Sequence, residues 1–191
     1  MRALFALILL LVCGAALAAP NTAAPDKPSA PKPASQEQLF AQLKQAQSAE
    51  DAQPIEQKLL ALFRVSGSPS VDLLVTRVQT ALSAADRKTA KQLIDAVTRI
   101  APGYAEGWHI RAGLEHAADD DTAALVSLQK VILLNPRHFA ALNTLGDMLQ
   151  EYGDKAGALK LYRRALEVDP QLPGVGQKIR ELTHSVEGRD I

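Results

Sequence analysis

The chain has 191 residues and carries 21 Lys and Arg against 21 Asp and Glu, so its formal net charge is zero. A neutral chain has no basic field to attract nucleic acid or an anionic membrane, which excludes nucleic acid as an expected partner. Hydrophobic residues make up 47% of the sequence but aromatic residues only 4%, and Ala and Leu are abundant. This composition favours packed helices over a β-sandwich and predicts an all-α fold.

The amino terminus has the three-part pattern of a secretory signal. Met1 and Arg2 precede an apolar run over residues 3–12, and small residues continue to Ala18. We expect cleavage after Ala18 and export, most simply to the periplasm of a Gram-negative bacterium. An uncleaved anchor is the alternative, although the run is shorter than the roughly 20 apolar residues that span a bilayer.

Cys13 is the only cysteine, and its lipidation would be a second kind of tether. Lipoprotein signals carry Gly, Ala or Ser before the cysteine, whereas Val12 stands there. Cleavage after Ala18 would remove the thiol and with it any disulfide, thiolate metal site or cysteine nucleophile. The next segment, residues 19–35, is rich in Pro and Ala and predicts a disordered tether.

A first helix is predicted to begin after Ser35, because Ser35 and Gln38 have the spacing of a capping box and apolar residues follow at helical intervals. A second helix is expected to carry Pro54 in its first turn. Gly67 and Pro69 are expected to end that helix. The two helices predict one antiparallel pair.

The sequence beyond this pair repeats with a period of 34 residues. The repeating columns hold prolines, small residues, large apolar residues and aspartates: Pro102, Pro136 and Pro170; Ala90, Ala124 and Ala158; Val78, Ala112 and Gly146; Leu74, Trp108 and Leu142; Ile94, Leu128 and Tyr162; Asp86, Asp120 and Asp154. A small residue four positions after a large one lets a neighbouring helix approach closely, so we expect Gly146 to face Ala158. The aspartates are placed to cap the second helix of each unit, and the prolines to stop it.

These columns resemble the tetratricopeptide repeat, whose signature is W-x2-L-G-x2-Y, then A-x3-F, then a terminal Pro. The third unit resembles it most fully, through Leu142, Leu145, Gly146, Ala158, Tyr162, Ala165 and Pro170. The second unit departs from it with Arg111 in the Leu column and Glu115 in the Tyr column, and the first unit has Arg77 in that Leu column. Residues 67–74 and 135–142 are similar to small exported repeat proteins of α-proteobacteria.

The resemblance implies a right-handed α-solenoid of stacked antiparallel helix pairs. Apolar residues at helical spacing near the carboxyl terminus predict a capping helix. We expect the signal segment at residues 1–18, the tether at 19–35 and the degenerate helix pair at 36–70. The three repeats are expected at 71–104, 105–138 and 139–172, and the capping segment at 173–191.

The resemblance also implies a concave groove, lined by the first helix of each pair, that binds a protein or peptide. The repeat register gives this lining: Val75, Thr76, Gln79, His109, Ile110, Gly113, His116, Asn143, Thr144, Asp147 and Gln150. We expect an extended peptide or a helix to dock there, with hydrogen bonds from Asn143 and Gln150. Some members of the family hold a chaperone's terminal carboxylate with several Lys, Arg and Asn residues, a set of which this lining has only Asn143.

Catalytic and metal-binding patterns are weak. His109 and His116 share a helix face, but seven residues separate them by about 10 Å, which is too far for one ion. The aspartates at 119–121 lack the Gly and the distant Glu of a calcium loop, and no phosphate loop, H-E-x-x-H or nucleophile elbow occurs. We therefore expect no enzyme activity, no cofactor and no metal.

Arg77 and Arg111 lie one repeat apart in a column that is usually part of the core. We expect partly buried guanidiniums paired with carboxylates, and presentation of charge to an acidic ligand is the alternative. The sequence as a whole predicts a periplasmic adaptor or scaffold for another protein. A membrane-tethered or lipidated subunit of a cell-envelope assembly is the second reading, and an enzyme or metal-binding protein is the third.

Overall fold

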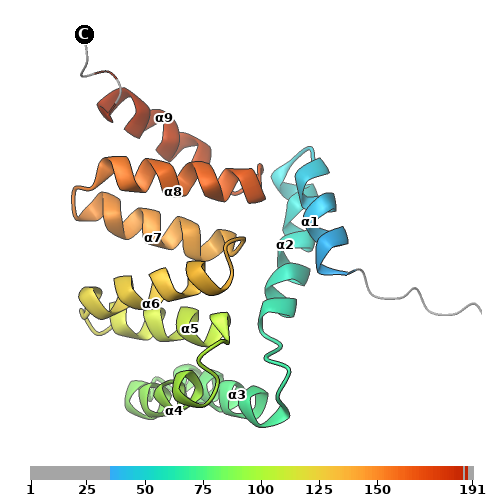
Figure 1. The fold of residues 1–191 in the computed structure, drawn as a ribbon, viewed down its shortest axis with the longest axis vertical. Coiled ribbons are helices and arrows are strands. Elements are labelled where there is room, and N and C mark those ends of the chain that lie inside the picture. Colours follow the sequence, from blue (N-terminus) through green and yellow to red (C-terminus); the bar gives the residue numbers. More distant parts are fainter. Residues whose placement is uncertain (1–34, 187, 189–191) are drawn as a thin grey trace, which may run out of the picture. The chain divides into compact units, whose positions relative to one another are not determined.

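The computed structural model describes residues 35–186 and 188, so the predicted signal segment, Cys13 and nearly all of the predicted tether lie outside the described residues. Within that part of the chain every regular element is a helix, which confirms the predicted all-α fold (Figure 1). The helices are α1 (Gln36–Gln45), α2 (Ala49–Phe63), α3 (Pro69–Ser83), α4 (Arg87–Ile100), α5 (Ala105–His116), α6 (Asp121–Leu134), α7 (Phe139–Glu151), α8 (Lys155–Val168) and α9 (Val175–Val186). Among these described helices, none has the length and apolar character that a membrane crossing requires.

The turn between the two helices of a pair is built in the same way three times. An aspartate at each turn accepts a hydrogen bond from the backbone N–H three residues later and so caps α4, α6 and α8, as predicted; these are Asp86, Asp120 and Asp154. The residue before each aspartate has a left-handed backbone. Gly153 adopts φ 84° there, and Ala85 and Asp119 adopt 56° and 59°. The repeated cap therefore holds the turn even where the sequence lacks glycine.

The pairs α3–α4, α5–α6 and α7–α8 pack in succession, and α9 packs on α8 (Figure 1). In the third unit the small residue of the first helix is a point of close approach. A Cβ added to Gly146 would lie 2.6 Å from Cε1 of Tyr162. The nearest atoms to Gly146 thus belong to the ring of Tyr162, one turn further along α8 than Ala158. The prediction of a close contact at Gly146 is confirmed, and the side chain nearest to it is Tyr162.

Gly146→Ala is expected to lower the free energy of unfolding by about 1–3 kcal/mol, because the new Cβ would overlap the Tyr162 ring. Gly113→Ala is the matched control, since a Cβ at Gly113 in α5 meets no atom within 4 Å. Alanine there should raise stability by up to about 1 kcal/mol through helix propensity. Urea denaturation of both variants measures the difference, and equal stabilities would contradict the close contact.

The amino-terminal pair α1–α2 does not pack along α3 as a further repeat would. Figure 1 shows α2 crossing the repeat helices at their ends, beside the turns that join one pair to the next. Contacts at three successive turns hold the pair there. Tyr104 Oη donates to the Arg64 carbonyl at 2.7 Å, and the ring centroids of Phe63 and His138 are 4.9 Å apart. Gln171 Nε2 donates to the Ala46 carbonyl at 3.2 Å. The predicted helix pair is present, but it packs against the edge of the stack.

The ends of α2 differ from the prediction, whereas the capping box that begins α1 is confirmed. Helix α2 begins at Ala49, where the Ser48 hydroxyl caps it, so Pro54 lies inside the helix and not in its first turn. The serine cap is the stronger start signal because the Ser48 hydroxyl accepts a hydrogen bond from the backbone N–H of Asp51, which has no partner within the helix. The helix also ends before Gly67, and Pro69 begins α3 instead of ending α2.

Two acidic side chains join α2 to the end of α8. Burial, followed by the charge of Asp169 and a hydrogen bond to it, raises the pKa of Glu56 to about 7. Asp169 is fully buried and accepts a hydrogen bond from the backbone N–H of Gln171 at 3.1 Å. The proton therefore stays on Glu56, where it can bridge the two carboxyl groups.

The Glu56 pair predicts a pH-dependent stability. The pKa of Glu56 in the folded state lies above its ordinary value of 4.5. The stability that the protonated pair contributes is therefore fully present below about pH 4.5 and is lost as the pH rises through about 7. Glu56→Gln, which supplies a neutral amide at every pH, should therefore exceed wild type in stability at about pH 8 by about 1 kcal/mol, after screening by solvent. Glu50→Gln, at an exposed position of α2, is the control. Guanidinium denaturation measures the stability difference between Glu56→Gln and wild type. If this difference does not grow between about pH 5 and about pH 8, the shared proton is contradicted.

Candidate functional site

A pocket of about 520 Å³ opens between α3 and α5, the first helices of two successive pairs. Its lining comes from α3, from α5 and the residue after it, from the turn before α4 and from the first residue of α4: Gln79, Leu82, Ala85, Arg87, Glu106, His109, Ile110, Gly113, Leu114 and Ala117. Four of the predicted lining residues border it, namely Gln79, His109, Ile110 and Gly113. Because Gly113 has no side chain and nothing lies within 4 Å of where a Cβ would be, the surface of α5 is bare at this point.

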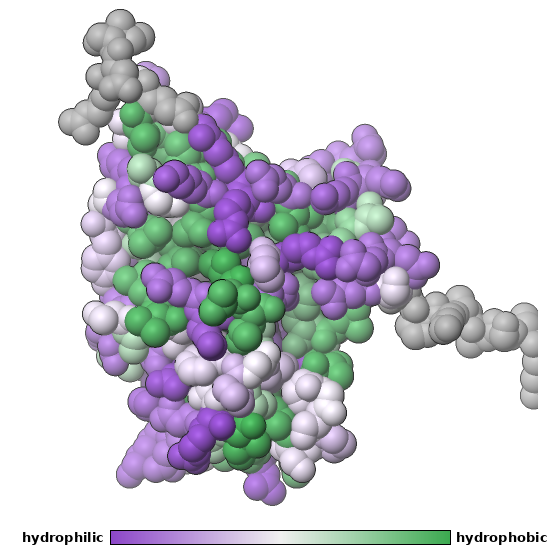
Figure 2. All heavy atoms as spheres, in the orientation of Figure 1, coloured by the Kyte–Doolittle hydropathy of each residue, from purple (hydrophilic) through white to green (hydrophobic). Residues whose placement is uncertain are grey.

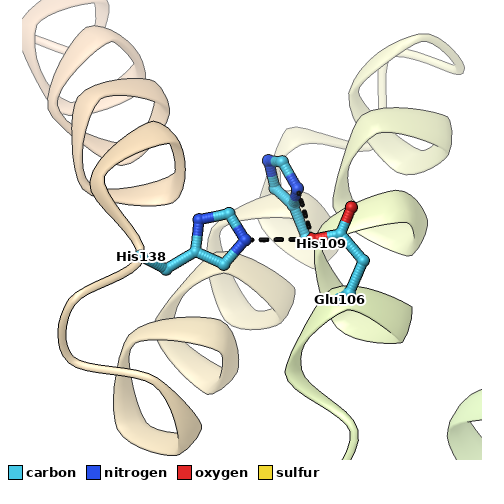
Figure 3. Close-up of side chains that lie close together, drawn as sticks. All are labelled: Glu106, His109 and His138. Carbon is cyan, nitrogen blue, oxygen red and sulfur yellow. Dashed lines mark hydrogen bonds and ion pairs between the residues drawn. The ribbon is translucent and has the colours of Figure 1, made fainter. Parts of the chain in front are cut away.

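Two imidazoles hold the carboxylate of Glu106 at one end of the pocket (Figure 3). Its Oε2 lies 3.0 Å from Nε2 of His138 and 3.3 Å from Nδ1 of His109. Glu106 is only 7% exposed. Burial favours the neutral acid, but the hydrogen bonds from His109 and His138 outweigh burial and lower the pKa of Glu106 to about 2. The carboxylate is therefore ionised at neutral pH.

His138 is fully buried and acts as the N-cap of α7. Its Nδ1 accepts a hydrogen bond from the backbone N–H of Ala141 at 3.2 Å. Because that bond uses the lone pair of Nδ1, the neutral ring carries its proton on Nε2 and donates it to Glu106. Burial lowers the pKa of His138, which keeps the ring neutral at neutral pH.

Glu106, His109 and His138 are also residue types that bind metal ions, and their donor atoms lie within 4.8 Å of one another. The hydrogen bonds of His138 oppose this use. A metal at Nε2 needs the lone pair there, so the ring proton would move to Nδ1 and face the N–H of Ala141. Metal binding would thus cost α7 its cap. As it stands, the arrangement is a buried carboxylate held by two imidazole donors.

The other residues of the predicted lining lie outside this pocket. Val75 is 7% exposed and packs with Val71 and Val78, because this side of α3 packs in the core with α4; its assignment to the lining was wrong. Thr76 is exposed on α3, and Nδ1 of His116 lies 2.6 Å from Oδ1 of Asp121.

The predicted lining on α7 is occupied by other side chains of the chain. Lys178 of α9 donates to Oδ1 of Asn143 at 3.1 Å and forms an ion pair with Asp147. The Tyr162 hydroxyl donates to Oε1 of Gln150 at 3.0 Å. The hydroxyl of Thr144 donates to the backbone carbonyl four residues earlier. Helix α9 therefore does more than cap the stack, because it also reaches the groove side of α7.

The sequence reading did not find Glu106, His138 or Lys178. His138 occupies the repeat column of Tyr104, and both residues precede the first helix of a unit, but the same column holds Ser70 and Leu172, so the column gave no signal for a functional histidine. Glu106 and Lys178 carried no signal either, because a single acidic or basic residue on an amphipathic helix is ordinarily a solvated one.

Arg111 is partly buried and pairs with Glu115 at 2.6 Å, as expected. Glu115 is 5% exposed and also accepts a hydrogen bond from the Ser127 hydroxyl at 2.6 Å. The two departures of the second unit from the repeat signature are thus partners of one another. The same expectation was wrong for Arg77, which is exposed and forms no ion pair with any described residue. One repeat before Glu115 stands Ala81, so Arg77 has no carboxylate in that place.

The Arg111 and Glu115 pair predicts a strong coupling between two substitutions. Arg111→Leu alone should destabilise the fold by about 3–5 kcal/mol, because it leaves the buried Glu115 carboxylate without its cation. Adding Glu115→Met should restore most of that loss, since an apolar pair of similar volume needs no charge compensation. Thermal unfolding of the two single variants and the double variant measures the coupling, and additive losses would show that the two side chains act independently.

The geometry defines a class of protein: stacked antiparallel helix pairs with a pocket between first helices. Residues 139–172 match the tetratricopeptide repeat family. A TPR repeat-containing protein of Rhizobium etli is 26% identical over 152 residues, covering 80% of this chain and 74% of that protein. The chain is thus similar to tetratricopeptide-repeat proteins, and its Rhizobium relative fits the predicted resemblance to repeat proteins of α-proteobacteria.

Solved structures share the fold. MamA has a TM-score of 0.57 at 21% identity, covering 74% of this chain and 81% of that one. The first TPR of Spaghetti (RPAP3), bound to an HSP90 peptide, has a TM-score of 0.56 at 15% identity, covering 61% and 93%. The Yersinia enterocolitica type III secretion chaperone SycD, in complex with a peptide of the translocator YopD, has a TM-score of 0.56 at 12% identity, covering 62% and 95%.

Proposed function

We propose that this protein is an interaction adaptor that binds a peptide or helix of a partner protein in the pocket between α3 and α5. The observation that carries the proposal is the open pocket itself, in which apolar side chains flank the bare α5 backbone at Gly113. Such a surface allows another chain to approach closely and to bury apolar side chains. The bound peptides in the RPAP3 and SycD structures support the proposal by showing that the fold accommodates such ligands.

The contacts that α8 and α9 make with α7 restrict the proposed binding surface to the first and second repeat units. Lys178 and Tyr162 engage Asn143, Asp147 and Gln150, so hydrogen bonds from these groups to a ligand would first have to break bonds within the chain. Between α3 and α5 the lining side chains leave a hollow instead. Figure 2 shows hydrophobic side chains gathered over the middle of the repeat stack, with hydrophilic ones around them.

For its location we propose export, with the adaptor acting in the periplasm. The support is the signal-like pattern of residues 1–18, followed by the Pro- and Ala-rich segment that would separate the repeats from the membrane during transfer. A retained or lipidated amino terminus would instead make the chain a tethered subunit of an envelope assembly. The mass of the mature protein separates the two: loss of residues 1–18 supports the free adaptor, and a full-length or lipid-modified chain supports the tether.

Gly113→Leu tests the binding surface, because Gly113 lines the pocket and a Cβ there meets no atom within 4 Å, so the new side chain should occupy pocket space. Peptides selected from a random phage-displayed library on the wild-type protein should bind this variant at least about tenfold more weakly. Gly176→Leu in α9 is the matched control, as its Cβ would meet only the end of Arg180, at 3.6 Å, and it should bind the peptides as wild type does. Fluorescence anisotropy gives the affinities and thermal unfolding confirms the fold. Equal binding by both variants would move the binding surface away from the pocket.

A further inference from the structure

The Glu106 carboxylate uses only one of its two oxygens within the fold. Oε2 lies within reach of both imidazoles, of His109 and His138, whereas Oε1 accepts no hydrogen bond from any described residue. In Figure 3 the second oxygen points away from the two rings. Since Glu106 is part of the pocket lining, this oxygen is available to a donor from a bound molecule in exchange for solvent.

The buried imidazole of His138 orients this carboxylate without removing its charge. His138 is held neutral by its burial and by the cap bond to Ala141, so it contributes an N–H dipole and no positive charge. The neighbouring walls of the pocket are apolar, notably at Leu82, Ile110 and Leu114. A negative charge beside apolar walls is poorly screened by water and attracts a cation more strongly than an exposed carboxylate would.

The opposite end of the pocket carries a positive charge. Nη1 of Arg87 donates to the backbone carbonyl of Ala117 at 3.3 Å, and both residues line the pocket. Glu106 and Ala117 are separated by eleven residues of α5, which at 1.5 Å per residue is about 16 Å. A cationic ligand group is therefore attracted at the Glu106 end and repelled at the Arg87 end, which fixes the direction of a bound segment.

We propose that Glu106 anchors a basic side chain, lysine or arginine, of the partner segment that the pocket binds. The inference rests on the proposed function and names the chemistry of the partner. A guanidinium or ammonium group has only donors to offer, which matches the unused Oε1. Its aliphatic stem would lie along Ile110 and Leu114, and the apolar residues that follow it would cover the bare backbone at Gly113.

The test uses synthetic peptides taken from the library selection. One position at a time is replaced by arginine, citrulline, norleucine or glutamate, and the affinities for wild type, Glu106→Gln, Glu106→Asp and Gly113→Leu are measured by fluorescence anisotropy. At one position arginine should bind on the order of 30-fold more tightly than citrulline, which has nearly the same shape without the charge. Glu106→Gln should abolish this preference while leaving the citrulline affinity unchanged, and Glu106→Asp should retain part of it.

The outcomes separate this inference from the proposed function. No peptide binding by wild type, or binding that Gly113→Leu leaves intact, overturns the adaptor pocket itself. Binding that depends on Gly113 but shows no preference for arginine over citrulline overturns the anchor and leaves the adaptor standing. This comparison needs only wild type, so it decides the matter even if Glu106→Gln fails to fold. Zinc chloride is added to test for a metal site. If it binds wild type, competes with the arginine peptide and loses this effect in His109→Ala, the three residues form a metal site and the anchor is overturned.

Discussion

The spacing of the whole stack depends on how closely the two helices of each pair approach at one small residue. Val78, Ala112 and Gly146 occupy that position and are buried, as are Ile94, Leu128 and Tyr162 on the second helices; at Gly146 the Tyr162 ring lies directly over the backbone. Helix α4 packs on α3 and also on α5, so it sets the distance between these two first helices. The pocket is the space that remains between α3 and α5 once α4 has separated them. A larger side chain in the small column would therefore change the pocket without being part of it.

Features that depend on neighbours along the chain were predictable from the sequence. An aspartate caps the N–H three residues ahead, so Asp86, Asp120 and Asp154 could be assigned without knowing what the helices contact. The packing of α1 and α2 could not, because it depends on contacts with turns far away in the sequence. Arg77 shows the same limit. Its repeat column predicted a partly buried guanidinium, but the carboxylate that pairs with Arg111 has no counterpart one repeat earlier.

The site was predictable only in part, and for a related reason. The repeat register placed Gln79, His109, Ile110 and Gly113 on the pocket because their helix faces recur every 34 residues. The carboxylate and its two imidazoles come together from two helices, with Glu106 and His138 separated by 32 positions. The third unit follows the repeat signature most fully, yet α9 engages its groove side. The open pocket lies between the first and second units instead, and the departures of the second unit, Arg111 and Glu115, pair with one another outside its lining.

The position of α1 and α2 changes how the repeat array should fold. In an ordinary stack each unit contacts only its neighbours, so unfolding can begin at an end and proceed unit by unit. Here Arg137 bonds to Glu37 across 100 positions of sequence, and Gln171 bonds to Ala46 across 125. These contacts raise the contact order and tie the carboxyl-terminal repeat to the first helices of the chain. The amino-terminal helices, although synthesised first, can complete their packing only after the last repeat has formed, so the array should fold more slowly and unfold as a single cooperative unit.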